Sequence, residues 1–343
     1  MAPCSSRFAV VLLVATSLLT SSVDALSASN NNNNEMSRRS AMKQVAASTL
    51  GSSCLYLPSS QNVALADTAS DIRPIATLAD GSKFPLASFG LQIYNDDTAY
   101  KLTMTALEVG YRNFFASVLA GNQKGFAKAV KASGIPREEL YICGSVVSNR
   151  ASGFDEAKKA TTKGWKKNME CFSVGDIGYL DQIMLDYPGP DCSSIQGQWA
   201  AFEEMHSLGL TKSLSVSNFS PDQLDCVLSK AKVKPVVNQL PYSVAYHPGS
   251  SVNENSKRGV LVQAWAPLGG SLGGRFSSSI KGACGKIGKK YGKSWAQVAL
   301  RWIVQSGASF TTQSKNERHF KEDLDIFDFE LTEDEMTSLS RLA

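Results

Sequence analysis

The 343-residue chain has few histidines and no paired cysteine motif. It contains three histidines, and its seven cysteines form neither a CxxC pair nor a Cys/His cluster. This spacing excludes the usual zinc sites, and a dense disulfide framework is not expected in a domain of this size. We therefore expect no metal site and isolated buried thiols. The cysteines are Cys4, Cys54, Cys143, Cys171, Cys192, Cys226 and Cys284.

The chain also lacks a strong charge of either sign. Its net charge is +4, and half of that excess precedes Asp67, so the remainder is close to neutral. Nothing in this balance favours a nucleic acid or an anionic membrane as partner. Apolar residues make up 43% and charged residues 19%, which is ordinary for a globular protein. We expect a monomer without a nucleic-acid partner.

No apolar run is long enough to cross a bilayer comfortably. The run at residues 8–19 follows Arg7 and precedes small residues at 23–25, the pattern of a secretory signal peptide. Residues 1–25 are therefore expected to be removed, which leaves a mature chain without a transmembrane span.

Residues 26–66 contain a segment that resembles a second targeting signal. Five asparagines at 30–34 cannot bury enough surface to fold. Arg38 and Arg39 then precede a weakly apolar run at 41–57 and an Ala-Leu-Ala site before Asp67, as in a twin-arginine signal. Two consecutive targeting signals resemble those of proteins that are imported into a plastid with extra membranes and delivered to the thylakoid lumen. The alternative is one signal peptide and a disordered linker, which gives a secreted or endomembrane protein.

Residues 67–343 alternate short apolar runs with helical patterns. Asp80-Gly81 predicts a hairpin turn before the first unit. Strands are expected at 85–91, 111–116, 139–147, 179–186, 214–217, 235–240, 260–266 and 308–312. Helices are expected at 96–109, 122–133, 154–172, 199–208, 221–229, 295–305, 317–324 and, beyond the repeating units, 333–342.

This alternation predicts an α/β protein with a (β/α)₈ TIM barrel, an N-terminal β-hairpin and an extra C-terminal helix. Val, Ile and Leu dominate several strands, as a sheet covered on both faces requires. An open doubly wound sheet usually brings a G-x-G-x-x-G after its first strand, and none is found there.

Six runs, in order along the chain, resemble the aldo-keto reductases. The resemblance covers nearly all of residues 72–343 and implies the barrel fold and NADPH-dependent reduction of aldehydes and ketones. The runs are residues 108–112, 216–219, 237–239, 262–269, 296–302 and 325–331.

The same resemblance locates four altered catalytic positions. The family uses an Asp, a Tyr, a Lys and a His, of which the Tyr protonates the carbonyl oxygen. The matching positions hold Phe115, Ala120, Ser145 and Asp186. Alanine has no proton to give, and the ion pair that lowers the phenol pKa is lost at both ends. Tyr94, Cys143 and Tyr187 are candidate replacement acids, although each is more simply read as core or wall.

The cofactor positions are partly kept. By resemblance Ser217, Asn218 and Gln239 hold the nicotinamide carboxamide, and Trp265 stacks on its ring. At the adenosine end of the expected cofactor site, Ser314 and Glu322 match the family's residues. Gln313 and His319 replace two cations that grip the adenosine phosphate, and Asp323 replaces an asparagine. NADP(H) binding is therefore expected to be weak or lost, although Lys315 and Arg318 lie close by in sequence.

Three hypotheses follow. The first is a non-catalytic relative that binds a nucleotide, and a small carbonyl ligand, for regulation. The second is an active NADP-dependent oxidoreductase with a rewired proton donor, where Asp186 can serve only if burial raises its pKa. The third is a structural barrel that binds a partner.

Overall fold

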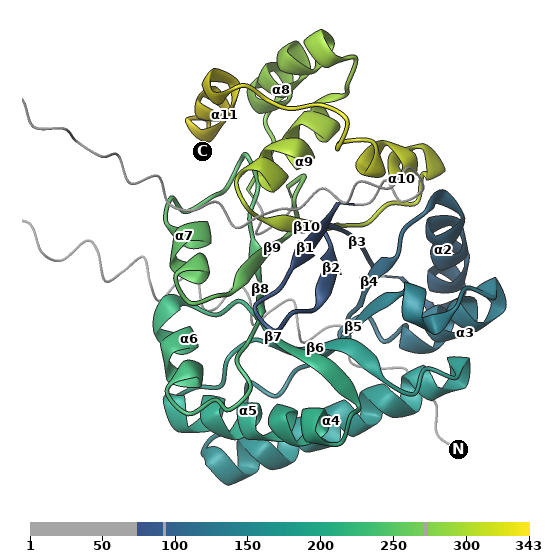
Figure 1. Cartoon of the computed structure of the whole chain (residues 1–343), viewed down its shortest axis with the longest axis vertical. Helices are drawn as coiled ribbons and strands as arrows, with labels where there is room; N and C mark the ends of the chain where they lie inside the picture. The colour runs from purple at the N-terminus through teal and green to yellow at the C-terminus, as the bar shows by residue number, and fades with distance from the viewer. Residues whose placement is uncertain (1–73, 92–93, 270–273) are drawn as a thin grey trace, which may run out of the picture. The chain divides into compact units, whose positions relative to one another are not determined.

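A closed barrel of eight parallel strands forms the centre of the molecule, shown in a computed structural model (Figure 1). The structure describes residues 74–91, 94–269 and 274–343. The predicted signal peptide and twin-arginine segment lie outside these residues. No helix of the described part is long and apolar enough to cross a membrane.

The strand order around the barrel is β10-β3-β4-β5-β6-β7-β8-β9, with β9 pairing back to β10. Their carboxyl ends therefore meet at one rim, where side chains from different strands can converge. The strands are β3 (Ala87–Gly90), β4 (Asn113–Ala116), β5 (Tyr141–Val146), β6 (Leu180–Asp186), β7 (Thr211–Ser217), β8 (Val237–Pro241), β9 (Leu261–Trp265) and β10 (Ser309–Thr312).

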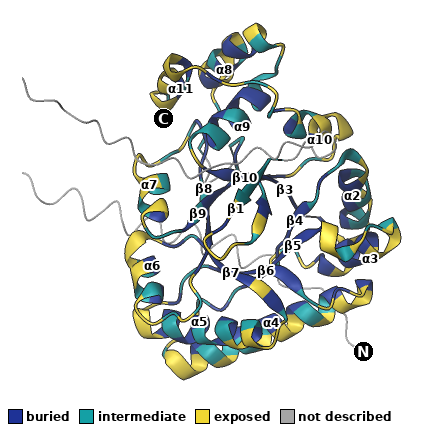
Figure 2. Ribbon diagram, viewed as in Figure 1, coloured by how far each residue is buried: buried dark blue, intermediate teal, exposed yellow. Residues whose placement is uncertain are grey.

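Helices surround the barrel, with buried faces toward the strands and exposed faces outward (Figure 2). The α-helices are α2 (Asp96–Val109), α3 (Gln123–Ser133), α4 (Phe154–Phe172), α5 (Cys192–Ser207), α6 (Pro221–Leu228), α7 (Ser251–Ser256), α8 (Ser278–Tyr291), α9 (Trp295–Gln305), α10 (Glu317–Leu324) and α11 (Glu333–Ser340). Short 3₁₀ turns η1 (Arg137–Glu139) and η2 (Ser173–Gly175) precede β5 and β6.

The predicted hairpin lies where the barrel strands begin. β1 (Ile75–Thr77) and β2 (Lys83–Pro85) pair antiparallel. The Phe84 ring meets Tyr141, the first residue of β5, at 5.0 Å, and Ser213 near the start of β7 donates to Asp80 at 2.6 Å. The hairpin therefore packs on the amino end of the barrel, and the opposite rim remains for a site.

The expected fold is confirmed, and four helices, α2, α4, α9 and α10, have the bounds that the sequence predicted. α5 begins seven residues before the predicted start, because Asp191 caps it directly after the Pro-Gly-Pro turn and accepts from Ser194 N at 2.9 Å. The sequence reading missed α7 and α8. α8 contains Gly282, Gly285 and Gly288, which weaken its helical signal.

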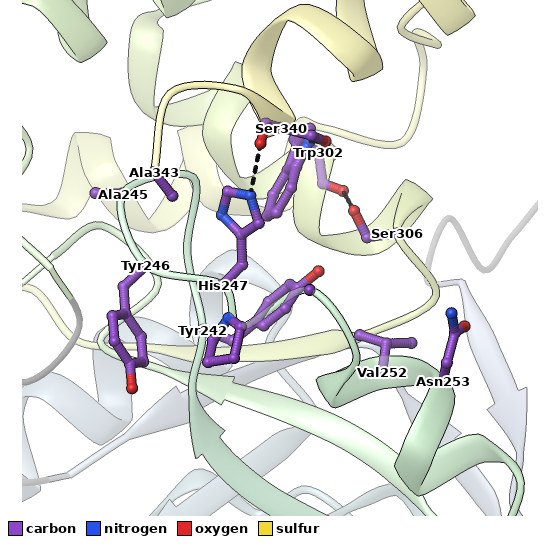
Figure 3. A pocket seen from close by; sticks show the side chains of 12 residues that line it. Tyr242, Ala245, Tyr246, His247, Val252, Asn253, Trp302, Ser306, Ser340 and Ala343 are labelled. Carbon is purple, nitrogen blue, oxygen red and sulfur yellow. Dashed lines mark hydrogen bonds between the residues drawn. The ribbon is translucent and has the colours of Figure 1, made fainter. Parts of the chain in front are cut away.

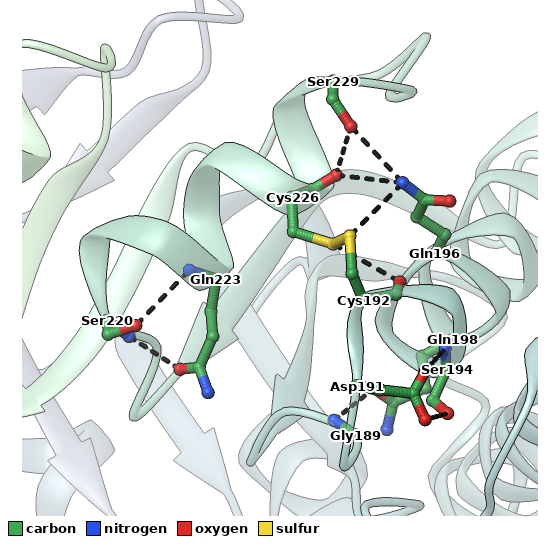
Figure 4. Close-up of a disulfide and its surroundings, with 10 residues drawn as sticks. All are labelled: Gly189, Asp191, Cys192, Ser194, Gln196, Gln198, Ser220, Gln223, Cys226 and Ser229. Atoms are coloured by element: carbon green, nitrogen blue, oxygen red, sulfur yellow. Dashed lines mark hydrogen bonds between the residues drawn. A yellow bond between two sulfur atoms is a disulfide. The ribbon is translucent and has the colours of Figure 1, made fainter.

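A disulfide joins Cys192, the first residue of α5, to Cys226 in α6 (Figure 4). The expectation of isolated thiols is therefore wrong for this pair. The two cysteines lie 34 residues apart, and only packing the two helices together brings their Cα atoms to 5.8 Å. Cys143 and Cys284 are buried and free, as expected.

Replacing Cys192 and Cys226 by serine is expected to lower the free energy of unfolding by about 3 kcal/mol, because the crosslink restricts the unfolded chain. Denaturant unfolding measures this change. A Cys171→Ser control, a free half-buried thiol, is expected to stay within about 1 kcal/mol of the parent. A double variant as stable as the parent would show that the crosslink contributes nothing.

Candidate functional site at the carboxyl rim

Polar side chains gather where four neighbouring strands end. In the sheet register Asp186 of β6 faces Ser217 of β7, and Ser217 faces Gln239 of β8. Trp265 ends β9, beside Pro241 of β8. The structure thus brings the four predicted positions onto one arc of the rim.

The backbone turns sharply at three of these strand ends. Tyr187 after β6, Asn218 after β7 and Ala266 after β9 have φ values of 71°, 64° and 51°. They are three of the four non-glycine residues with positive φ among those described. This conformation is costly for an L-residue and concentrates at functional sites. The Asn218 turn is held by its own N–H, which donates to Gln239 O at 3.0 Å.

The Asn218 amide connects the cluster. Its Nδ2 donates to Ser217 Oγ at 2.9 Å and, more weakly, to Asp186 Oδ1 at 3.4 Å. Its Oδ1 accepts from Trp265 Nε1 at 3.3 Å. One side chain therefore orients the serine, the indole and the carboxylate together.

A second amide pair lies beside this network and was missed by the sequence analysis. Gln239 Nε2 donates to Gln263 Oε1 at 2.8 Å, and both side chains are buried. Gln263 is two residues before Trp265 on β9, so the period of two places it on the same side of the strand. The two-residue spacing between Gln263 and Trp265 was the sequence feature that could have predicted this contact.

A small apolar cluster lies inside the barrel on β4, β5 and β6. Phe115 of β4 packs with Cys143 of β5 and Met184 of β6 in a buried cluster. The ring is 2% exposed. Space that an ion pair would need is therefore filled by a phenyl ring, a thiol and a thioether.

Ser145 supports the backbone of the loop after β4. Its Oγ accepts from Val118 N at 3.0 Å, and its carbonyl accepts from Asn168 Nδ2 at 2.8 Å. Ala120 lies in the same loop, where its N–H donates to Ser117 O at 3.2 Å. Ser145 thus helps to set the position of Ala120, and neither residue supplies a charge.

Asp186 is the one acidic group among the four positions that the sequence resemblance matches to the catalytic residues. It is 5% exposed, and burial raises its pKa from 3.8 to about 6, although hydrogen bonds with Ser217 and Asn218 oppose the shift. Among the described residues no ion pair includes it. Burial thus raises the pKa of Asp186, as a proton donor at this position requires, but the carboxyl group is mostly ionised above neutrality.

The other candidate acids are poorer donors than free side chains. Burial raises the pKa of Tyr94, of Tyr187 and, to well above its usual range, of Cys143. Lys315 lies over the Tyr94 ring at 5.6 Å from its centre. Cys143 lies inside the apolar cluster with Phe115, and besides burial the charges of Asp186 and Asp181 raise its pKa, which disfavours a thiolate.

The segment after β10 is largely engaged in internal contacts. Ser314 Oγ accepts from Asn316 N at 3.0 Å and lies 3.1 Å from His319 Nδ1. Glu322 pairs with Arg318 at 3.2 Å. Glu322 therefore compensates part of the Arg318 charge, and Arg318 would attract a bound anion less strongly than an unpaired arginine.

A separate cavity of about 590 Å³ lies between the segment after β8, α7 and α9, and it shares no residue with the rim cluster (Figure 3). The Tyr242 ring stacks on Trp302 at 5.4 Å. His247 Nδ1 lies 2.9 Å from Ser243 O and its Nε2 lies 3.0 Å from Ser340 O. The histidine thus lies against the C-terminal helix α11 and outside the rim cluster.

The sequence matches the aldo/keto reductase family over residues 86–343. The chain belongs to this family. It is similar to the glyoxal reductase of Bacillus subtilis, with 29% identity over 276 residues that cover 79% of this chain and 93% of the relative. An aldo/keto reductase structure from Brucella melitensis has 27% identity and a TM-score of 0.70, and the match covers 79% of this chain and all of that one.

A Bombyx mori aldo-keto reductase in complex with NADP has the same fold, with a TM-score of 0.69 and 22% identity over 79% of this chain and 92% of that one. Aldo/keto reductases bind NADP(H). The rim cluster around Asn218 occupies the strand ends to which the sequence resemblance assigned the nicotinamide.

Asp323 is a buried acid at the end of the segment after β10, and its burial has a measurable consequence. It is 5% exposed, and burial raises its pKa from 3.8 to about 7, against a hydrogen bond from Thr312. The unfolded chain releases this proton near 3.8, so native stability falls as pH rises from there to about 7.

Asp323→Asn is therefore expected to raise the free energy of unfolding above pH 7 by about 2–4 kcal/mol, with a gain that shrinks toward acidic pH. Denaturant unfolding across pH measures this. Asp334→Asn, at an exposed position of α11, is the control and is expected to change little. A gain that is equal at all pH values would contradict the burial argument.

Proposed function

We propose that this aldo/keto reductase binds NADP(H) at the carboxyl rim and reduces aldehydes and ketones slowly or not at all. The observation that carries the proposal is the contrast between two adjacent groups. The Asn218 network retains uncharged donors and acceptors that suit a carboxamide, with Trp265 beside them. The neighbouring cluster of Phe115, Cys143 and Met184 consists of uncharged side chains and contains no acid–base pair.

The nicotinamide end fits the cofactor. Ser217, Asn218 and Gln239 present hydroxyl and amide groups on adjacent strand ends, and the half-buried Trp265 indole is held by Asn218. These groups can donate to a carbonyl and accept from an amide. When bound, the reduced cofactor supplies a hydride.

Carbonyl reduction needs a proton and stabilisation of negative charge on oxygen, and both are missing. Ala120 has no proton to transfer. Asp186, with a pKa of about 6, carries a negative charge at neutral pH close to where an oxyanion would form. A fixed negative charge repels a forming oxyanion and so raises the free energy of this transition state.

Affinity for the cofactor is expected to be low, with little preference for NADPH over NADH. The adenosine 2′-phosphate is normally gripped by fixed cations. Here Gln313 is uncharged, Arg318 is paired with Glu322, and Lys315 lies over the Tyr94 ring. Ser314 is engaged with His319.

Calorimetric titration of NADPH and NADH into the chain that begins at Asp67 tests the proposal. We expect saturable micromolar binding. Asn218→Ala is expected to weaken it about tenfold or more, since one amide orients three groups. Asn253→Ala, an exposed asparagine at the separate cavity, is the matched control and should not change it. Absence of binding at millimolar cofactor would reject the proposal and favour a partner-binding barrel.

A second candidate is an active oxidoreductase in which Asp186 is the proton donor. The raised pKa of its carboxyl favours this reading. Such an enzyme would reduce aldehydes faster as pH falls through about 6, because the acid form then accumulates. A carbonyl reductase rate that is low and independent of pH in this range would exclude it.

We also propose that the leader directs the protein to a plastid, and from there to the thylakoid lumen. The stacked signals in residues 1–66 support this, and the Cys192–Cys226 disulfide is consistent with an oxidising compartment. Replacing Arg38 and Arg39 by lysine in a fluorescent fusion is expected to block the last step. A fusion that is secreted would favour the alternative location.

A further inference from the structure

Asp186 differs from most other buried acids of the described structure in having only uncharged partners. Buried Asp181 pairs with Arg137 at 2.6 Å and with Lys212 at 3.0 Å, and Glu335 pairs with Lys290 at 2.7 Å. Asp186 accepts from the Asn218 amide, and no cation of the described residues pairs with it. A buried carboxylate without a counter-charge costs free energy that a bound cation would recover.

The groups around Asp186 do not supply that charge. The titratable neighbours are Cys143 on β5 and Tyr187 after β6, and burial raises the pKa of both, so each stays neutral at physiological pH. The remaining contacts are Ser217 and Asn218. The carboxylate therefore lies at the carboxyl end of β6 as a negative charge without a paired cation among the described residues.

The charge at this rim has the opposite sign to what carbonyl reduction needs. Ser145 stands where the family has a lysine, Phe115 where it has the aspartate that pairs with that lysine, and Asp186 where it has a histidine. The balanced ion pair is gone and one negative charge is added. Such a site destabilises a forming alkoxide and stabilises a positive charge on the substrate.

We propose that this rim accepts substrates with a positively charged carbon–nitrogen double bond, either iminium ions or protonated imines, with Asp186 as the counter-ion. The proposal rests on the cofactor binding proposed above and names the substrate class of that same site.

This substrate class removes the need for the missing acid. A hydride from the reduced nicotinamide forms a C–H bond at the iminium carbon, and the π electron pair of the C=N bond moves to nitrogen. The product is a neutral amine, and the nicotinamide is oxidised. No proton enters the step, so Ala120 in place of tyrosine is no obstacle. Loss of the lysine charge becomes an advantage, because that charge would repel the substrate.

Binding can be tested without turnover. Two ligands of nearly the same size are titrated by calorimetry into the chain from Asp67 at saturating 1,4,5,6-tetrahydro-NADP, an analogue of the reduced cofactor whose ring is uncharged and transfers no hydride. N-methyl dihydroisoquinolinium carries a fixed positive charge, and α-tetralone is a neutral ketone. We expect the cation to bind about tenfold more tightly, which corresponds to about 1.4 kcal/mol.

Asp186→Asn keeps the shape and removes the charge, so the preference for the cation should disappear in this variant. Asp334→Asn, at an exposed position, should keep it. The preference should also fade as pH drops below about 6, because protonation of Asp186 removes the charge. At saturating reduced cofactor, the parent should oxidise it faster with the iminium than with the ketone.

The outcomes separate the two proposals. If the cofactor binds but both ligands bind equally, or the preference persists in Asp186→Asn, the cationic substrate class is wrong and the cofactor site stands. If no cofactor binds, both proposals fail. If ketone reduction accelerates as pH falls through 6 and is lost in Asp186→Asn, the residue is a proton donor and the counter-ion role is overturned.

Discussion

Aldehyde reduction should rise about 10³-fold when the four family residues are restored together, because a positioned acid with its supporting charges contributes about 10²–10⁴-fold. The substitutions are Phe115→Asp, Ala120→Tyr, Ser145→Lys and Asp186→His. The tyrosine supplies the proton, the lysine lowers its pKa, and the histidine replaces a carboxylate that opposes the oxyanion. Steady-state oxidation of NADPH with a simple aldehyde measures the change.

The matched control keeps Ala120 and carries the other three substitutions. It should stay near the parent rate, because the site then has charge but no phenol. A parent chain that already reduces aldehydes at ordinary enzyme rates would contradict the account. So would a quadruple variant that folds and binds NADPH but remains inactive.

Single charges placed in the barrel interior are expected to destabilise the fold strongly. Phe115→Asp puts a carboxylate beside Cys143 and Met184, and Ser145→Lys puts an ammonium where a hydroxyl now accepts from Val118 N. Each change alone should lower the free energy of unfolding by about 3–5 kcal/mol, because a buried charge without a partner is costly.

The double variant should lose less than the sum of the two, by about 1–3 kcal/mol, since each charge partners the other. Denaturant unfolding of the four proteins in this cycle measures the coupling. Phe115→Ala is the control for the lost ring, because part of the aspartate effect is an empty volume. Additive losses would show that the two positions do not face each other, and the assignment of the altered ion pair would fail.

Much of the fold was readable from the sequence because its signals are local. α2 follows Asn95, whose side chain accepts from Thr98 N, and ends at Gly110 with φ 116°, where glycine is favoured. α9 begins with a capping box between Ser294 and Gln297. α8 was missed because its three glycines lower the helical propensity, although Ser277 and Gly292 cap its ends.

The site was predictable in position but not in its interactions. Parallel strands end at one rim, so the sequence was enough to place Ser217, Gln239 and Trp265 together. The Asn218 network and the packing of Phe115 against Met184 depend on side-chain directions that a sequence does not specify. The disulfide also depends on tertiary packing.

The raised pKa of Asp186 illustrates the same limit. An aspartate at a strand end can be solvated and acidic or buried and weakly acidic, and only the environment decides. Here Ser217 and Asn218 provide hydrogen bonds without charge, so burial dominates and the pKa rises to about 6. Asp181 is equally buried but lies between two cations.

We propose that this barrel has kept cofactor binding and lost carbonyl reduction. One experiment measures both cofactor binding and carbonyl reduction. NADPH is titrated into the chain from Asp67 while tryptophan fluorescence is followed. A simple aldehyde is then added while nicotinamide absorbance is recorded. We expect saturable quenching, since Trp265 lies in the rim cluster, followed by almost no oxidation of the bound cofactor. Turnover at about 1 s⁻¹ or faster, the range of ordinary enzymes, would contradict it.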